Sequence, residues 1–267
     1  MGAFVDLLKK GKKPIIGMVH LAALPGSVHF TEPFEKTAER AKREYHTLIE
    51  NGFDGVILQN TGDVPAPETG DEATIAFMTK AGLMLRSKSD NIIGVNVLMN
   101  GSKAALAIAK AIHADFVRIK INSGVVATST GIVAADPHDV LSFRNRIDAR
   151  NIDMIGDLYD RTAAPVGPFP LEVLADLALR HADMAALVIS GYDHQDLIAR
   201  LKLLREKLPK ALLVIGGGAK KSNLSQLMHL CDGLIVGSSI KSGGGFLDPI
   251  DPEKASAFMD EANRLRR

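Results

Sequence analysis

The 267-residue sequence contains a single cysteine, Cys231, almost no net charge and no long hydrophobic run. One thiol can form neither an internal disulfide nor a zinc-binding cysteine cluster, which favours a reducing, cytoplasmic compartment. The formal charge of +1 lacks the basic bias typical of nucleic-acid-binding proteins. No apolar stretch reaches the roughly 18 residues of a membrane span, and the first residues, MGAFVDLLKKGKKP, lack the charge order of a secretory signal. We therefore expect a soluble protein that binds no nucleic acid and has no transmembrane segment.

Two sequence patterns alternate along the chain. Short runs of β-branched and aliphatic residues predict strands at 15–20, 55–60, 92–98, 116–121, 153–159, 186–191, 212–216 and 233–237. Helical periodicity follows each of them, at 34–51, 72–88, 102–113, 137–149, 170–181, 194–208, 221–230 and 252–266.

Eight strand–helix repeats with apolar strands predict a parallel sheet closed into a (β/α)8 TIM barrel, with a doubly wound open sheet as the less favoured alternative. No linker divides the chain, so we expect one domain over 1–267. Residues 1–13 are predicted to form a short helix that caps the bottom of the barrel.

Polar residues concentrate where the predicted strands end, which is where barrel enzymes place their chemistry. They are His20, Asn60, Asp63, Asn96, Asn100, Lys120, Asp157 and Ser190. Any one of them could simply meet solvent at the end of its strand. Together they predict a site at the C-terminal face.

Glycine-rich turns follow the last two predicted strands. Strand seven ends in Gly216, Gly217 and Gly218, and strand eight ends in Gly237, Ser238 and Ser239. Without a Cβ atom, backbone N–H groups can converge on an anion, and the loops after strands seven and eight form the recurrent phosphate site of barrels. Glycine also permits ordinary tight turns. Because both turns fall at these two positions, we expect a phosphate-binding barrel.

Three side chains, His20, Lys120 and Asp157, are candidates for catalysis, and Arg118 accompanies Lys120 on the same strand. His20 could be a general base or a metal ligand, or could hydrogen-bond to loop carbonyls. Arg118 and Lys120 alternate with apolar residues and should point the same way. Lys120 could be a base or a Schiff-base nucleophile, but a structural salt bridge with Asp157 across the barrel is the simpler reading. Asp157 could itself be a base or a metal ligand.

A divalent metal is possible but unsupported by any compact ligand motif. His20, Asp157, Asp193 and His194 are the available donors, and their spacing matches no known pattern. Asp193 and His194 are better explained as residues that begin the helix at 194–208. No cofactor is predicted with any specificity.

Several segments resemble the BtpA/SgcQ family over nearly the full length. They are IIGMVHLAALPGS (15–27), FDGVILQNTGDVP (53–65), IIGVNVLMN (92–100), ALAIAKAIHADFVRIKINSG (105–124), LVISG (187–191) and CDGLIVGSSIK (231–241). The resemblance implies a TIM barrel related to phosphate-binding barrels. It also implies that His20, Asn60, Asp63, Asn96, Arg118, Asp157, Ser190 and the terminal glycines match the family pattern.

The chain departs from that pattern beside the expected site. Gln59, Met99, Gly101 and Lys120 replace a Glu, an Arg, an Asp and an Asn, Ser129-Thr130-Gly131 replaces Asp-Gln-Gly, and Arg161-Thr162 replaces Lys-His. A changed set of charges beside a retained phosphate cradle implies either altered substrate specificity or binding without turnover.

The leading hypothesis is an enzyme that acts on a small phosphorylated, sugar-derived metabolite. His20, Asp157 and Lys120 would be catalytic, and Asn60, Asp63, Asn96, Arg118 and Ser190 would bind substrate. The rival hypothesis is a noncatalytic assembly or biogenesis factor that binds a partner protein, as one branch of the family, named for photosystem I biogenesis, suggests. A homo-oligomer is expected in either case.

Overall fold

The computed structural model describes residues 2–86, 91–158, 162–167 and 169–266. Within these residues, eight parallel strands close into a barrel in the order β1-β2-β3-β4-β7-β9-β10-β11, with β11 paired back to β1. The strands are β1 (Ile15–His20), β2 (Gly55–Gln59), β3 (Ile92–Asn96), β4 (Phe116–Ile119), β7 (Asp153–Leu158), β9 (Ala186–Ile189), β10 (Leu213–Ile215) and β11 (Gly233–Val236). The predicted TIM barrel is confirmed, and each of these strands lies within its predicted range.

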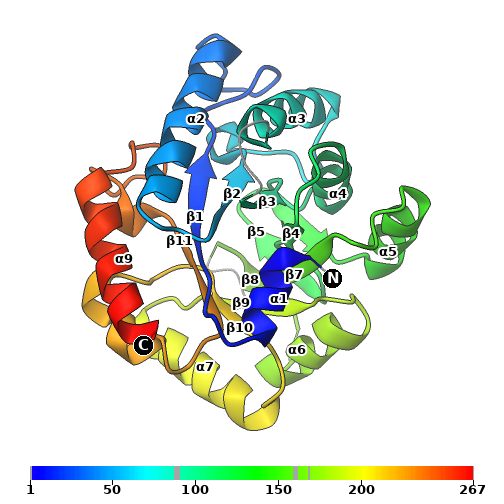
Figure 1. Ribbon diagram of the computed structural model, residues 1–267. Helices are drawn as coiled ribbons and strands as arrows, with labels where there is room; N and C mark the ends of the chain where they lie inside the picture. The colour runs from blue at the N-terminus through cyan, green and yellow to red at the C-terminus, as the bar shows by residue number, and fades with distance from the viewer. Residues whose placement is uncertain (1, 87–90, 159–161, 168, 267) are drawn as a thin grey trace.

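Helices surround the strands as a ring (Figure 1). They are α2 (Phe34–Glu50), α3 (Glu72–Arg86), α4 (Ser102–Ala111), α5 (Pro137–Arg146), α6 (Leu171–Arg180), α7 (His194–Lys207), α8 (Leu224–Leu227) and α9 (Pro252–Arg266). The helix expected at 221–230 is shorter than predicted: a 3-10 turn, η2 (Lys221–Asn223), precedes the four residues of α8. None of the helices in the described ranges has the length and hydropathy needed to cross a membrane.

The alternation of side chains along each strand produces two separate apolar clusters. Residues such as Ile16, Ile57 and Phe116 fill the barrel interior, whereas Val19, Leu58 and their equivalents pack against the helices. Both faces of each barrel strand are therefore covered, which explains the continuous hydrophobic runs in the sequence.

Helix α1 (Ala3–Lys9) lies at the N-terminal end of the barrel, in front of the strands in Figure 1. Phe4, Val5 and Leu8 pack into the interior cluster, and the Phe4 ring stacks on that of Phe116 with centroids 4.5 Å apart. The backbone N–H of Gly2 donates to Asp153, the first residue of β7. Among the described residues, α1 therefore fills the N-terminal end of the barrel, and the C-terminal end is left for a site.

A small antiparallel sheet that was not predicted from the sequence lies beside that C-terminal end. It consists of β5 (Val125–Thr128), β6 (Gly131–Ala134) and β8 (Ala164–Pro165), with β5 in the middle. The sequence VVATSTGIVA at 125–134 shows the pattern of a β-hairpin, because two runs rich in β-branched residues are separated by a two-residue turn. Short 3-10 turns, η1 (Thr61–Asp63) and η3 (Ser238–Ile240), follow β2 and β11.

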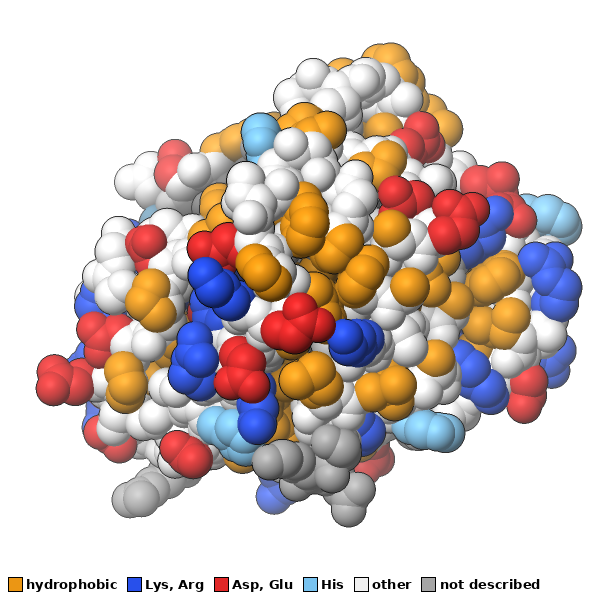
Figure 2. All heavy atoms as spheres, turned by 90° about the horizontal axis from the view of Figure 1, so that it is seen from above, with side chains coloured by type: hydrophobic (Ala, Val, Ile, Leu, Met, Phe, Trp, Pro, Cys, Tyr) orange, Lys and Arg blue, Asp and Glu red, His pale blue; other side chains and the backbone are white. Residues whose placement is uncertain are grey.

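The outer surface of the barrel is mixed in charge. Figure 2 looks onto the side where α2 and α3 lie and shows side chains of both signs on this face. On α2 the exposed positions include Glu35, Lys36, Glu39 and Arg43, and its buried positions repeat with helical spacing. Helix α2 is thus an ordinary amphipathic covering helix.

Candidate functional site

A cavity of about 920 Å³ opens at the C-terminal end of the barrel. This volume is near the upper end of the ~300–1,000 Å³ usual for small-molecule sites. The predicted residues that line it are His20, Arg118, Lys120, Ser190, Gly216, Gly217, Gly218, Gly237, Ser238 and Ser239. Both glycine turns and four of the predicted strand-end residues, His20, Arg118, Lys120 and Ser190, thus lie at this one cavity.

The two glycine turns lie at the same cavity and leave backbone donors available. Within the described residues, the N–H groups of Gly217, Gly218, Ser238 and Ser239 donate to no backbone carbonyl, whereas that of Gly216 donates to Ile189. Gly217 and Gly218 have φ values of +148° and +83°, which favour glycine, and a Cβ at Gly217 would meet open space. The backbone here is exposed toward the cavity because no side chain covers it.

The Ser239 hydroxyl adds a second observation at the same turn. Its Oγ is buried and, among the described residues, has no hydrogen-bond partner. A buried hydroxyl without a partner loses its hydrogen bonds to water and gains none from the protein. A ligand oxygen in the turn would supply the missing partner.

The guanidinium of Arg118 lies next to the Gly216 turn. An ideal Cβ on Gly216 would lie 3.1 Å from an Arg118 nitrogen. Arg118 donates to both carboxylate oxygens of Asp157, over 2.8 and 2.9 Å, and the Lys120 Nζ is 3.4 Å from the same carboxylate. Positive charge therefore borders the glycine turns, and one carboxylate neutralises part of it.

The salt bridge expected from the sequence exists, but not across the barrel. β4 and β7 are neighbouring strands, paired from Phe116 to Asp153 through Ile119 to Gly156. Arg118 and Asp157 thus meet between adjacent strand ends. The Asp157 carboxylate is turned into this pair and does not line the cavity, while both cations do.

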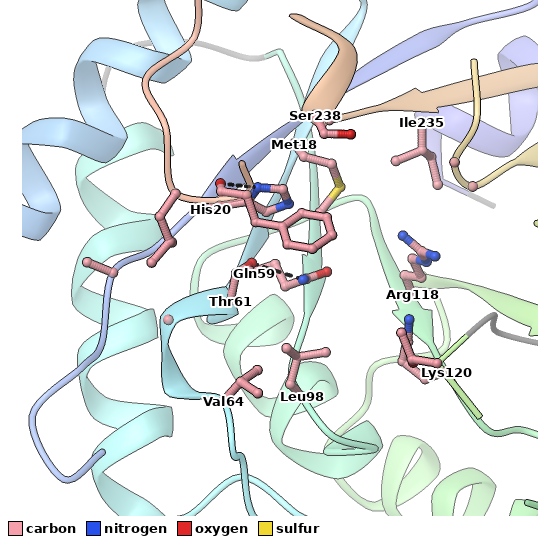
Figure 3. Close-up of a pocket in the computed structure, with 18 of the residues that line it drawn as sticks. Met18, His20, Gln59, Thr61, Val64, Leu98, Arg118, Lys120, Ile235 and Ser238 are labelled. Atoms are coloured by element: carbon pink, nitrogen blue, oxygen red, sulfur yellow. Dashed lines mark hydrogen bonds between the residues drawn. The ribbon is translucent and has the colours of Figure 1, made fainter. Parts of the chain in front are cut away.

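The His20 imidazole is held neutral with a defined tautomer. Its Nδ1 lies 2.8 Å from the carbonyl oxygen of Phe246, and because a carbonyl only accepts, Nδ1 must carry the proton. Burial, and then the positive charge of Lys241, lower the pKa of His20 to about 4. Nε2 is left as an unprotonated acceptor beside the cavity (Figure 3).

A buried ion pair supports the loop that holds His20. The Lys241 Nζ lies 3.2 Å from the Glu44 carboxylate on α2 and donates to the carbonyl of Asp248. Burial lowers the pKa of Lys241 and raises that of Glu44. Arg40, one turn before Glu44, donates to the carbonyl of His20. Together these contacts attach the segment 241–250 to α2, and α2 to His20 at the end of β1.

Three predicted substrate-binding residues do not line the cavity. Asn60 donates to the Asp63 carboxylate and accepts from the backbone of Leu98, and Asp63 accepts from the backbone N–H of Leu24. Asn96 donates to the carbonyl of Arg118. All three side chains are buried, and each bonds to the backbone of a neighbouring segment. Burial also raises the pKa of Asp63.

The remaining predictions concern the cap of α7, a metal site and the departures from the family pattern. Asp193 is the N-cap of α7, with its carboxylate accepting from the N–H of Asp196, as predicted. Within the described ranges, no three His, Cys, Asp or Glu side chains are grouped closely enough to hold a metal ion. Of the departures from the family pattern, Gln59, Met99, Lys120, Ser129 and Thr162 line the cavity, Gly101 packs against Val97, and Arg161 falls outside the described residues.

Sequence reasoning missed part of the cavity wall. Met18, His29, Arg40, Val64, Leu98, Phe246 and Leu247 line it without having been predicted. For Met18 the signal was available, because it shares the interior face of β1 with His20. Phe246 comes from a loop 226 residues away in sequence from His20, and no local pattern indicates such a contact.

The chain matches a known protein family over nearly its whole length. Residues 11–264 match the BtpA family. The chain belongs to the BtpA family. It is 35% identical to an uncharacterised protein of Thermococcus kodakarensis over 257 residues, covering 96% of this chain and 97% of the relative. It is 31% identical to the photosystem I biogenesis protein BtpA of Synechocystis over 250 residues, covering 92% and 87%.

Solved structures with the same fold include two proteins from Pyrococcus furiosus. Thiamine phosphate pyrophosphorylase has a TM-score of 0.58 and 14% identity, with 96% of this chain and 98% of that chain covered. N-(5'-phosphoribosyl)anthranilate isomerase has a TM-score of 0.58 and 11% identity, with 94% and 99% covered. At identities this low, the structural match shows a common barrel fold and nothing about the reaction. The chemistry of the BtpA-family protein has to be inferred from its own site.

Proposed function

We propose that this BtpA-family protein is an enzyme that acts on a small phosphorylated metabolite, held by its phosphate at the turns after β10 and β11. The observation that carries the proposal is the pair of glycine turns with available N–H donors, together with the buried, unpartnered Ser239 hydroxyl. Backbone donors and a nearby cation are the groups that bind phosphate in barrels. Arg118 lies beside the Gly216 turn and adds the cation.

The chemistry that fits the remaining groups is proton transfer at a carbon next to a carbonyl, or cleavage of a neighbouring carbon–carbon bond. Nε2 of His20 would accept the proton, because this imidazole is neutral at pH 7. The Lys120 ammonium would stabilise the negative charge that develops on the substrate oxygen. Asp157 acts as a positioning residue, since its carboxylate holds Arg118 and Lys120 rather than facing the cavity.

A thermal-shift experiment tests the phosphate site. Inorganic phosphate and a panel of sugar phosphates should raise the melting temperature of the wild type. The same ligands should leave the melting temperature of Gly217→Val unchanged, because the valine side chain would occupy the space over the turn. Gly11→Val is the matched control: Gly11 also has a positive φ and open space around it, but precedes β1 at the opposite end of the barrel. No shift of the wild type with any phosphorylated ligand would sink the proposal.

A role in assembly is the second candidate, supported by the name of the Synechocystis relative, photosystem I biogenesis protein BtpA. A partner-binding protein would need its outer surface, whereas an enzyme needs the cavity. His20→Gln and Gly217→Val should abolish biological activity if the protein is an enzyme. Full activity of both variants, together with a protein that co-purifies stoichiometrically, would favour assembly. Homo-oligomerisation stays a prediction in both cases.

A further inference from the structure

The cavity has two chemically different ends. In Figure 3, Ser238 lies at one end and Val64 and Leu98 lie at the other, with His20 along one side and Arg118 and Lys120 along the opposite side. Ala22, Ala23 and Met99 also line this cavity. Figure 3 also labels Met18 and Ile235 beside Ser238, so apolar side chains line both ends, and the backbone N–H donors of the turn at Ser238 are what distinguish that end from the end with Val64 and Leu98.

Polar side chains next to the end with Val64 and Leu98 are largely used by the protein itself. Asn60 and Asp63 bond to each other and to the backbone of Leu98 and Leu24, so they offer little to a ligand. The amide nitrogen of Gln59 donates to the Thr61 hydroxyl. A ligand group rich in hydroxyls would regain only part of its hydrogen bonds to water here, from the Gln59 amide oxygen and the Thr61 hydroxyl, and the shortfall costs binding free energy.

Apolar side chains around the same cavity remain half exposed. Val64 is 50% exposed, and Phe246 and Leu247 on the loop 242–249 are 52% and 43% exposed. A ligand that covered them would remove apolar surface from water and so gain affinity. The cavity of about 920 Å³ leaves room for such a group in addition to a phosphate.

We infer that the ligand carries a ring-sized apolar group at the end opposite its phosphate, in contact with Val64 and Leu98. This inference rests on the proposed function, because it takes the phosphate to be bound at the glycine turns. It narrows the substrate class from phosphorylated metabolites in general to phosphate esters with an aromatic or comparably apolar moiety.

Isothermal titration with three probes tests the inference. Inorganic phosphate reports on the glycine turns alone, glycerol 3-phosphate adds a hydroxylated tail, and phenyl phosphate adds an apolar ring. We expect phenyl phosphate to bind at least about tenfold more tightly than glycerol 3-phosphate. Equal or weaker binding of phenyl phosphate, with phosphate still bound, would overturn the inference and leave the proposed function standing. If none of the three binds, the proposed function itself fails, and the inference fails with it.

Two variants test whether the preference for phenyl phosphate depends on contact with Val64. Val64→Ser should reduce the phenyl phosphate preference severalfold and leave the affinity for inorganic phosphate unchanged, and the exposure of Val64 makes a folding defect unexpected. Leu83→Ser is the matched control, because Leu83 is equally exposed at 47% but lies on α3 outside the cavity. A preference unaffected by Val64→Ser, or reduced as much by Leu83→Ser, would contradict the proposed contact.

Discussion

At the scale of single residues, the polar side chains at the strand ends divide into two groups. His20, Arg118 and Lys120 face the cavity, whereas Asn60 bonds to the backbone of Leu98 after β3 and Asn96 bonds to the backbone of β4. The difference follows from geometry, because a side chain that reaches a buried backbone group satisfies that group and is no longer available to a ligand. Residue type alone does not distinguish the two uses.

The lowered pKa of His20 predicts a specific loss of stability in acid. Between pH 6.5 and about 4, the unfolded chain takes up a proton on this imidazole and the folded chain does not, so the free energy of unfolding falls as the pH is lowered. The full effect is about 3 kcal/mol. Urea unfolding at several pH values should show a flatter acid dependence for His20→Gln than for the wild type. Parallel curves for the two proteins would show that His20 titrates normally.

Removing the Asp157 carboxylate should be strongly destabilising. Asp157→Asn removes the negative charge and one of the two acceptor oxygens from a buried arginine, and breaking such a pair costs roughly 3–5 kcal/mol of unfolding free energy. Denaturant unfolding measures this cost. The exposed pair Lys10–Asp6 provides the control, since Asp6→Asn should change stability by less than about 0.5 kcal/mol. Similar losses for the two variants would mean that the Arg118–Asp157 pair is not effectively buried.

At the scale of elements, the site depends on a loop attached to a helix that is distant in sequence. The segment 241–250 begins with Lys241, whose ammonium pairs with Glu44 on α2, and its ends are joined by a bridge between Lys241 and Ile250. The same loop supplies the carbonyl of Phe246 that fixes the His20 tautomer. The position of the loop and the orientation of the imidazole are therefore coupled.

The Glu44→Gln variant should loosen this loop. The change leaves the Lys241 charge buried without its carboxylate, so we expect a loss of roughly 3 kcal/mol in unfolding free energy and faster amide hydrogen exchange over 242–249. The double variant Glu44→Leu, Lys241→Met removes both charges and should recover much of the stability. Unchanged exchange over 242–249 in Glu44→Gln would show that the ion pair does not hold the loop.

At the scale of the whole molecule, closure of the barrel joins the two ends of the chain. β1 and β11 pair in register from Ile15 with Leu234 to Gly17 with Val236, and α1 inserts Phe4 into the common interior. The interior cluster contains residues from every barrel strand. This continuity predicts that the chain unfolds as one domain.

Phe4→Ala tests that prediction. Loss of a fully buried phenylalanine should lower the unfolding free energy by about 3–5 kcal/mol and shift a single cooperative transition without splitting it. Calorimetry compares the calorimetric and van't Hoff enthalpies of the variant and the wild type. Phe30→Ala, at a position 41% exposed, is the control and should have little effect. A second transition appearing in Phe4→Ala would indicate that α1 and its neighbours unfold separately.

The sequence by itself determined the barrel, because hydrophobic periodicity and turn residues are local properties that each strand and helix displays in its own segment. It also located the glycine turns at the ends of strands seven and eight. Only the tertiary structure decided which polar side chains face the cavity, and that Phe246, Glu44 and Lys241 hold His20 in place. These contacts join residues up to 226 positions apart, and their geometry arises only once the barrel has closed.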